Sequence, residues 1–129
     1  MSTDNQPSIK VLTFTFESTL GFISKVACME NTLEGLREVI GCRCVACTEI
    51  KVGGKKYDVW SDDEALLQDA PFPSLFISDD LILFGNLVFA KHDEEGATIG
   101  LSSAEVALLK KFIQQQNKNF QLFVFKGVF

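Results

Sequence analysis

The chain has 129 residues, of which 47% are hydrophobic and 22% are charged, the composition of an ordinary globular domain. Its net charge of −5 disfavours direct binding to nucleic acid, because negative charge is repelled by the phosphate backbone. No apolar run approaches the roughly 18 residues that a membrane span needs, and the polar N-terminus carries no secretion signal, so we expect a cytoplasmic protein.

The first part of the domain predicts a β-hairpin. Residues 1–7 are polar and are expected to form a flexible tail, with a single domain over residues 8–129. Residues 9–17 and 22–28 are rich in β-branched and aromatic side chains and are separated by a short turn, which is typical of two paired strands.

A first helix is expected after this hairpin. Asn31 stands three residues before Glu34, which is the spacing of a capping box. Leu36 and Ile40 fall on one face of the helix that follows, and Gly41 is suited to end it in a left-handed conformation.

A second hairpin is expected next. Residues 42–51 and 56–60 read as strands on either side of the glycine pair at 53–54, which predicts a tight turn. Ser61 and Glu64 have capping-box spacing and predict a short helix, and the prolines at 71 and 73 predict an extended loop.

The last part of the chain predicts strands around one long helix. Residues 75–77 and 81–90 are apolar enough to form two strands, and Ser102 with Glu105 caps a helix that runs to about residue 117. Residues 120–129 are apolar on both faces and predict a final strand, covered by its own domain or by another chain.

Together these elements predict an α+β domain with a mainly antiparallel sheet of about six or seven strands. Two principal helices pack on it, and their apolar stripes are expected to share one face of the sheet.

The order of these turn and capping signals resembles that of a known domain family. The signals are the segment at 31–34 with Gly41, the sequence at 83–89, the acidic turn at 93–96 and the capped helix after residue 101. The chain is similar, over residues 9 to about 113, to a small domain family of unknown function found in phages, plasmids and conjugative elements of Gram-positive bacteria. The resemblance implies an accessory protein of a mobile genetic element in a host bacterial cell. It identifies no site residues.

The cysteines offer a candidate metal site. Cys42, Cys44 and Cys47 lie within six residues, and zinc prefers four cysteine or histidine ligands. Cys28, the single histidine His92 or a carboxylate could supply the fourth ligand of a structural zinc ion. Cys28 fits only in part. If the helix at 31–40 makes a crossover connection, the strands before and after it run parallel, and Cys28 at the end of the first lies at the opposite end of the sheet from Cys42 at the start of the second. Only Cys47, about 16 Å further along at roughly 3.3 Å per residue, would lie level with Cys28. The alternative is that these thiols are buried and pack as small apolar groups.

The remaining polar groups suggest binding surfaces more than catalysis. Paired carboxylates can hold a divalent cation or can imitate phosphates in a basic groove, and most of those here also suit turns and helix caps. A small metal-dependent hydrolase using His92 is the least favoured function, because no residue pattern activates a nucleophile. The residues expected to contact a partner are two acidic runs, Asp62, Asp63 and Glu64 and Asp93, Glu94 and Glu95, together with Phe123 and Phe125.

The sequence therefore favours a non-enzymatic binding protein. The leading hypothesis is an inhibitor of a host defence nuclease of the anti-CRISPR type, which would cover the nucleic acid channel of an RNA-guided nuclease. The alternative is a zinc-stabilised adaptor or regulator that forms a homodimer through its C-terminal strand.

Overall fold

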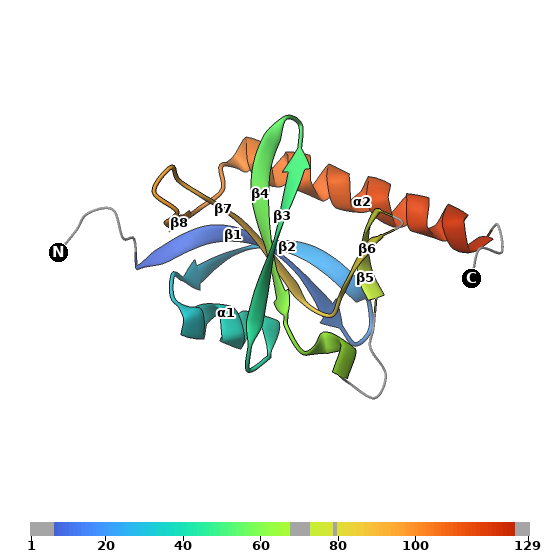
Figure 1. The fold of residues 1–129 in the computed structure, drawn as a ribbon, viewed down its shortest axis with the longest axis horizontal. Helices are drawn as coiled ribbons and strands as arrows, with labels where there is room; N and C mark the ends of the chain where they lie inside the picture. The colour runs from blue at the N-terminus through green and yellow to red at the C-terminus, as the bar shows by residue number, and fades with distance from the viewer. Residues whose placement is uncertain (1–6, 68–72, 79, 126–129) are drawn as a thin grey trace.

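The computed structural model describes residues 7–67, 73–78 and 80–125, so most of the expected N-terminal tail and the proline at 71 lie outside it. The described part is an α+β fold, shown in Figure 1. The strands are β1 (Ser8–Glu17), β2 (Gly21–Glu30), β3 (Val45–Val52), β4 (Lys55–Asp62), β5 (Pro73–Ser78), β6 (Leu81–Phe84), β7 (Leu87–His92) and β8 (Thr98–Ile99). The helices are α1 (Leu33–Ile40), the short 3-10 helix η1 (Ala65–Leu67) and α2 (Ser103–Phe125).

The main sheet has six strands and confirms the predicted mainly antiparallel architecture. Its order is β2-β1-β7-β4-β3, β8 pairs with β7, and every pairing is antiparallel. β5 and β6 form a separate two-stranded sheet. The expected strand at 81–90 is thus two strands in two sheets, because Gly85 adopts a φ of 76° that turns the chain between them.

The two helices cover opposite faces of the main sheet, so the expectation of one shared face was wrong. On β1, Leu12 packs in one apolar cluster with Leu109 of α2, whereas its neighbour Val11 packs in the other with Leu36 of α1. Successive side chains of a strand point to opposite faces. Because both faces of the central strands are apolar, each needs its own cover.

The helix ends follow the predicted chemistry, with one correction. The N-cap of α1 is Thr32, whose hydroxyl accepts a hydrogen bond from the Gly35 amide, while the Asn31 side chain donates to the Thr98 carbonyl instead. Gly41 ends α1 with a φ of 79°, as predicted.

Ser102 and Glu105 form the predicted capping box of α2. The Glu105 amide donates to the Ser102 hydroxyl at 3.1 Å, and the Ser102 amide donates to the Glu105 carboxylate at 2.8 Å. By contrast, Ser61 lies buried inside β4 and does not begin a helix.

The predicted C-terminal strand was wrong over residues 120–125, because α2 continues to Phe125. The side-chain amide of Gln116 donates to the carbonyls of Phe76 at 3.1 Å and Ile77 at 2.9 Å, which holds the helix against β5. An apolar run of this length fits a helix as well as a strand, and here the helix simply extends from a capped start. Residues 126–129 lie outside the described part of the chain.

Candidate functional site

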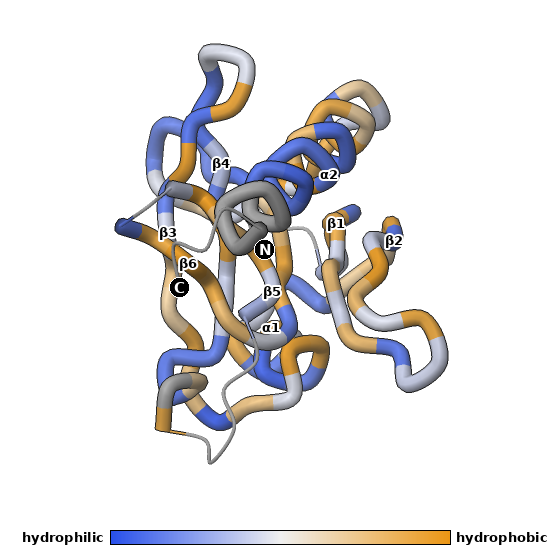
Figure 2. The backbone as a smooth tube through the Cα atoms, turned by 90° about the vertical axis from the view of Figure 1, so that its right-hand side faces the viewer, coloured by the Kyte–Doolittle hydropathy of each residue, from blue (hydrophilic) through white to orange (hydrophobic). Residues whose placement is uncertain are grey.

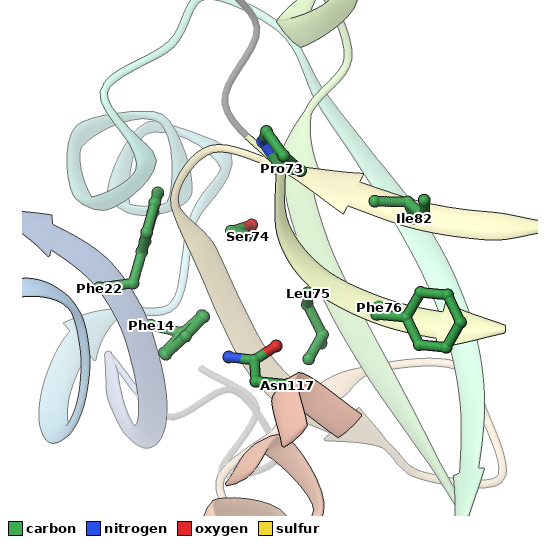
Figure 3. Close-up of a pocket in the computed structure, with 8 residues that line it drawn as sticks. All are labelled: Phe14, Phe22, Pro73, Ser74, Leu75, Phe76, Ile82 and Asn117. Carbon is green, nitrogen blue, oxygen red and sulfur yellow. The ribbon is translucent and has the colours of Figure 1, made fainter. Parts of the chain in front are cut away.

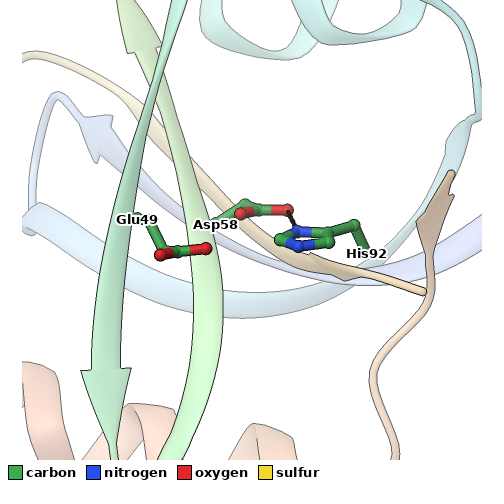
Figure 4. A group of neighbouring side chains, drawn as sticks. All are labelled: Glu49, Asp58 and His92. Carbon is green, nitrogen blue, oxygen red and sulfur yellow. Dashed lines mark hydrogen bonds and ion pairs between the residues drawn. The ribbon is translucent and has the colours of Figure 1, made fainter. Parts of the chain in front are cut away.

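A cluster of polar side chains spans three neighbouring strands of the main sheet. Glu49 of β3, Asp58 of β4 and His92 of β7 place a ligand atom each within 4.8 Å of one another. The register explains why, since Glu49 lies directly opposite Asp58, and Asp58 lies opposite Ala90, two residues before His92. All three side chains therefore project from the same face, and Figure 4 shows them pointing toward one another.

Asp58 is the buried centre of this cluster. Its side chain is 7% exposed, and one carboxylate oxygen lies 2.9 Å from Nδ1 of His92. The hydrogen bond with Asp58 and the negative charge of that residue raise the pKa of His92. Glu49 is more exposed, and its carboxylate lies 3.9 Å from the Lys56 ammonium. The cluster thus joins two carboxylates and one imidazole, with Lys56 at its rim.

The Cys47 thiol borders this cluster. Cys47 is two residues before Glu49 on β3 and shares its face, and its thiol hydrogen-bonds Asp58. Although the residue as a whole is exposed, partial burial of the thiol and the charge of Asp58 raise its pKa to about 11. The thiol is therefore protonated at neutral pH and is a weak nucleophile.

The structure does not bring together the predicted cysteine ligands. Cys28 lies on β2 and Cys47 on β3, which are the two edge strands of the main sheet. Cys42 and Cys44 precede β3, where the Cys42 thiol donates to the Cys44 carbonyl at 3.3 Å, and burial followed by the charge of Asp62 raises the Cys42 pKa. Within the described residues, the group of potential metal ligands around His92 contains carboxylates and no cysteine.

Glu49 and Asp58 were not among the predicted site residues, but the register of the second hairpin could have identified them as neighbours. A two-residue turn at Gly53 and Gly54 pairs each residue before it with one after it, so that Glu49 must lie opposite Asp58. Only the position of His92 on the neighbouring strand required the tertiary structure.

The two acidic runs lie at opposite ends of the paired strands β4 and β7. Asp62 ends β4, and its carboxylate accepts a hydrogen bond from the Glu64 amide at 2.8 Å. Glu64 pairs with Arg43 at 2.8 Å. At the other end, the carboxylate of Asp93 accepts hydrogen bonds from two backbone amides of its own turn, at 2.9 Å each. Asp63, Glu94 and Glu95 are exposed, so the six acids do not form one continuous row.

A second feature is a groove of mixed polar and apolar lining between the β1–β2 hairpin and α2. A cavity of about 260 Å³ lies among the hairpin, β5, β6 and α2, as Figure 3 shows, and a cavity of about 510 Å³ lies between the hairpin and α2. Phe14, Phe22 and Asn117 line both, so the two cavities form one groove. The rings of Phe14 and Phe22 lie 5.5 Å apart. Figure 2 shows the hairpin at one side of the molecule beside α2. Phe123 and Phe125 belong to the last turns of α2.

The fold and these two features define a small α+β domain with a carboxylate–imidazole cluster on one sheet face and a groove on the other. Residues 21–115 match the model of a domain of unknown function, DUF3846, and the chain belongs to that family. Searches of curated proteins and of solved structures found no significant match. Among the described residues, no helix has both the length and the apolar character needed to cross a membrane.

Proposed function

We propose that this protein is a non-enzymatic binding protein whose contact surface is the outer edge of β2 together with the groove between the β1–β2 hairpin and α2. We call this the hairpin surface; its exposed apolar residues are Phe16, Leu20 and Val26. The observation that carries the proposal is the ten-residue strand β2, which pairs with β1 along its whole length and with no other described strand.

An edge strand of this kind is a template for a partner strand. Its outer row of backbone amides and carbonyls can add an extended segment of another protein to the sheet. The opposite edge, β3, is shorter and has two charged residues in its interior, Glu49 and Lys51, whereas the interior of β2 has one, Lys25. It is therefore less suited to this role, since charged side chains protect a sheet edge from pairing. On β2, Val26 is 48% exposed and Leu20 at the hairpin turn is 69% exposed, so apolar groups accompany the edge.

The groove supplies the pocket that such a segment needs. Backbone pairing gives affinity, while side-chain pockets beside the strand give specificity. Phe22 and Ser24 of β2 line the larger cavity, directly beside the backbone edge. We propose that the occupant is an extended segment of a partner protein that carries an apolar side chain for the Phe14 and Phe22 rings, which are part of the lining of this cavity. The net charge of −5 favours basic flanking residues in that partner.

The partner class follows from the family resemblance and the charge. Proteins of mobile elements meet the host's defence nucleases, whose nucleic acid channels are basic. We propose an RNA-guided nuclease of the host as the partner, inhibited by occupation of its surface. An acidic protein is drawn to such a channel by long-range attraction.

The test compares two matched variants in cells that carry an active RNA-guided nuclease. Val26→Lys places a charge on the hairpin surface, while Leu67→Lys places the same charge on η1, at a residue that is 79% exposed. We expect the wild type and Leu67→Lys to protect a targeted plasmid and to co-purify with the nuclease, and Val26→Lys to do neither.

Two results would contradict the proposal. If the wild type neither protects the plasmid nor co-purifies with the nuclease, the nuclease is not the partner. If Val26→Lys behaves as the wild type while binding is intact, the hairpin surface is not the contact.

A further inference from the structure

We propose that Glu49, Asp58 and His92 form a binding site for one divalent transition-metal ion of the zinc type. This site lies on the sheet face opposite to that of the groove, so it is independent of the proposed protein contact. It also differs from the cysteine site that the sequence suggests.

The first argument is the placement of two carboxylates directly opposite each other. Glu49 and Asp58 are register partners in the antiparallel β3–β4 pair. Side chains in such pairs have Cβ atoms about 4.5–5.5 Å apart, and like charges in this position destabilise the sheet. Aspartate is also poorly suited to a strand interior. A cation between the two carboxylates turns this repulsion into binding energy.

The second argument is the burial of Asp58. Only 7% of its side-chain surface is exposed, and its hydrogen-bond partners are the His92 ring and the Cys47 thiol. Burying a carboxylate is unfavourable unless a positive charge or several donors compensate for lost water. The lysine near the cluster, Lys56, lies 3.9 Å from Glu49 and is largely solvent-exposed. A divalent ion would neutralise both carboxylates at once.

The donor set selects the class of metal. One imidazole nitrogen and two carboxylate oxygens are common zinc ligands, bound at about 2.0–2.2 Å. When ligand atoms surround zinc in a tetrahedron at that zinc–ligand distance, they lie roughly 3.3 Å from one another. The ligand atoms of the three residues already lie within 4.8 Å of one another. Small rotations of exposed side chains suffice, because Glu49 and His92 are both exposed on rigid strands. An imidazole ligand disfavours calcium and magnesium, which prefer oxygen donors alone.

Three protein ligands leave one coordination position for water or for another donor. Cys47 lies beside Asp58 but outside the group of three. Its hydrogen bond orients the Asp58 carboxylate, the supporting role that neighbours of metal ligands commonly have. Asp93, which follows His92 directly, adds negative potential at the mouth of the site.

The test is zinc titration of the full chain by isothermal calorimetry at pH 7.5, after treatment with a chelator. We expect one ion per chain with a micromolar Kd or tighter. His92→Gln removes the single histidine of the chain, and Glu49→Gln changes an exposed residue. Each is expected to weaken binding at least ~10-fold while circular dichroism shows an unchanged fold. Glu94→Gln, an exposed acid on the adjacent turn, is the matched control and should bind as the wild type does.

A double variant separates this site from the cysteines. Cys42→Ser with Cys44→Ser should retain the wild-type Kd and stoichiometry. The proposal is overturned if the double variant loses binding while His92→Gln retains it, or if the wild type binds no zinc at 100-fold excess. A second readout is thermal unfolding, since zinc should raise the midpoint of the wild type and of Glu94→Gln but not of His92→Gln.

Discussion

The replacement Glu105→Gln should destabilise the fold by about 2–3 kcal/mol. The Glu105 carboxylate is buried, lies 2.9 Å from the Lys91 ammonium through both oxygens, and accepts the Ser102 amide at 2.8 Å. Burial alone would raise its pKa, but the hydrogen bonds from Ser102 and Lys91 outweigh burial and lower it from 4.5 to about 2. At 1.36 kcal/mol per pKa unit this difference corresponds to roughly 3 kcal/mol.

Glutamine keeps the shape of the side chain and removes its charge. It leaves the Lys91 ammonium, whose side chain is 28% exposed, without a charged partner, and it weakens the capping box of α2. The assay is urea unfolding at pH 7 followed by circular dichroism. Glu34→Gln, an exposed acid in the first turn of α1, is the control and should change the free energy of unfolding by less than about 0.5 kcal/mol.

The same pair predicts a pH dependence with a definite sign. The folded pKa of Glu105 is lower than the unfolded value, so its contribution is fully present above about pH 4.5 and is lost as pH falls toward about 2. The difference in stability between wild type and Glu105→Gln should therefore shrink over that interval. A loss below 1 kcal/mol at pH 7, or a difference that stays constant down to pH 2, would refute the reasoning.

Three further predictions concern other parts of the fold. Gly35→Ala should lower the free energy of unfolding, measured in urea, by about 2 kcal/mol or more, because the added methyl group would collide with the Glu30 carbonyl. An unchanged free energy would show that α1 can shift away from β2. Gln116→Ala should lower the free energy of unfolding by about 1–2 kcal/mol and speed amide exchange in the last turns of α2, because it removes both hydrogen bonds to β5. Unchanged exchange would contradict the anchoring role of Gln116. In the presence of a chelator at pH 8, Cys47 should react with a thiol reagent more slowly than Cys44, because the pKa of Cys47 is raised to about 11. Equal reaction rates of the two thiols, measured by mass spectrometry, would contradict the hydrogen bond between Cys47 and Asp58.

Local signals in the sequence predicted most of the elements, because their causes are local. The first hairpin, the turn at Gly53 and Gly54, the end of α1 at Gly41 and the capping box of Ser102 each depend on residues within a few positions of one another. Such features follow from backbone conformation and short-range hydrogen bonds, which the sequence states directly.

The errors arose where distant contacts decide the outcome. The composition of the apolar run after residue 119 predicts a strand. In the structure the capped helix before it continues to Phe125, and Gln116 holds that helix against β5. The sequence predicts both helices on one face, but Val11 and Leu12 are both fully buried in different apolar clusters, which divides the core between the two faces of the sheet. Neither result can be read from a local pattern, since the first depends on the contact of α2 with β5 and the second on which strands become neighbours.

In the candidate site, too, one part follows from the local sequence and the other depends on the tertiary structure. The opposition of Glu49 and Asp58 follows from the hairpin register alone, whereas His92 joins them because β7 pairs with β4 as well as with β8, its neighbour in sequence. The spacing of the cysteines predicts a metal site, but the strand order places Cys28 and Cys47 on opposite edges of the main sheet.

Hydrogen exchange of the complex tests the proposed mode of action most directly. Amide exchange of the protein alone would be compared with that of the protein bound to a purified RNA-guided nuclease. We expect new protection over β2, residues 21–30, and over the segment of α2 around Asn117, with no change along β3. Protection confined to β3 or to η1, or none at all in a stable complex, would contradict binding through the hairpin surface.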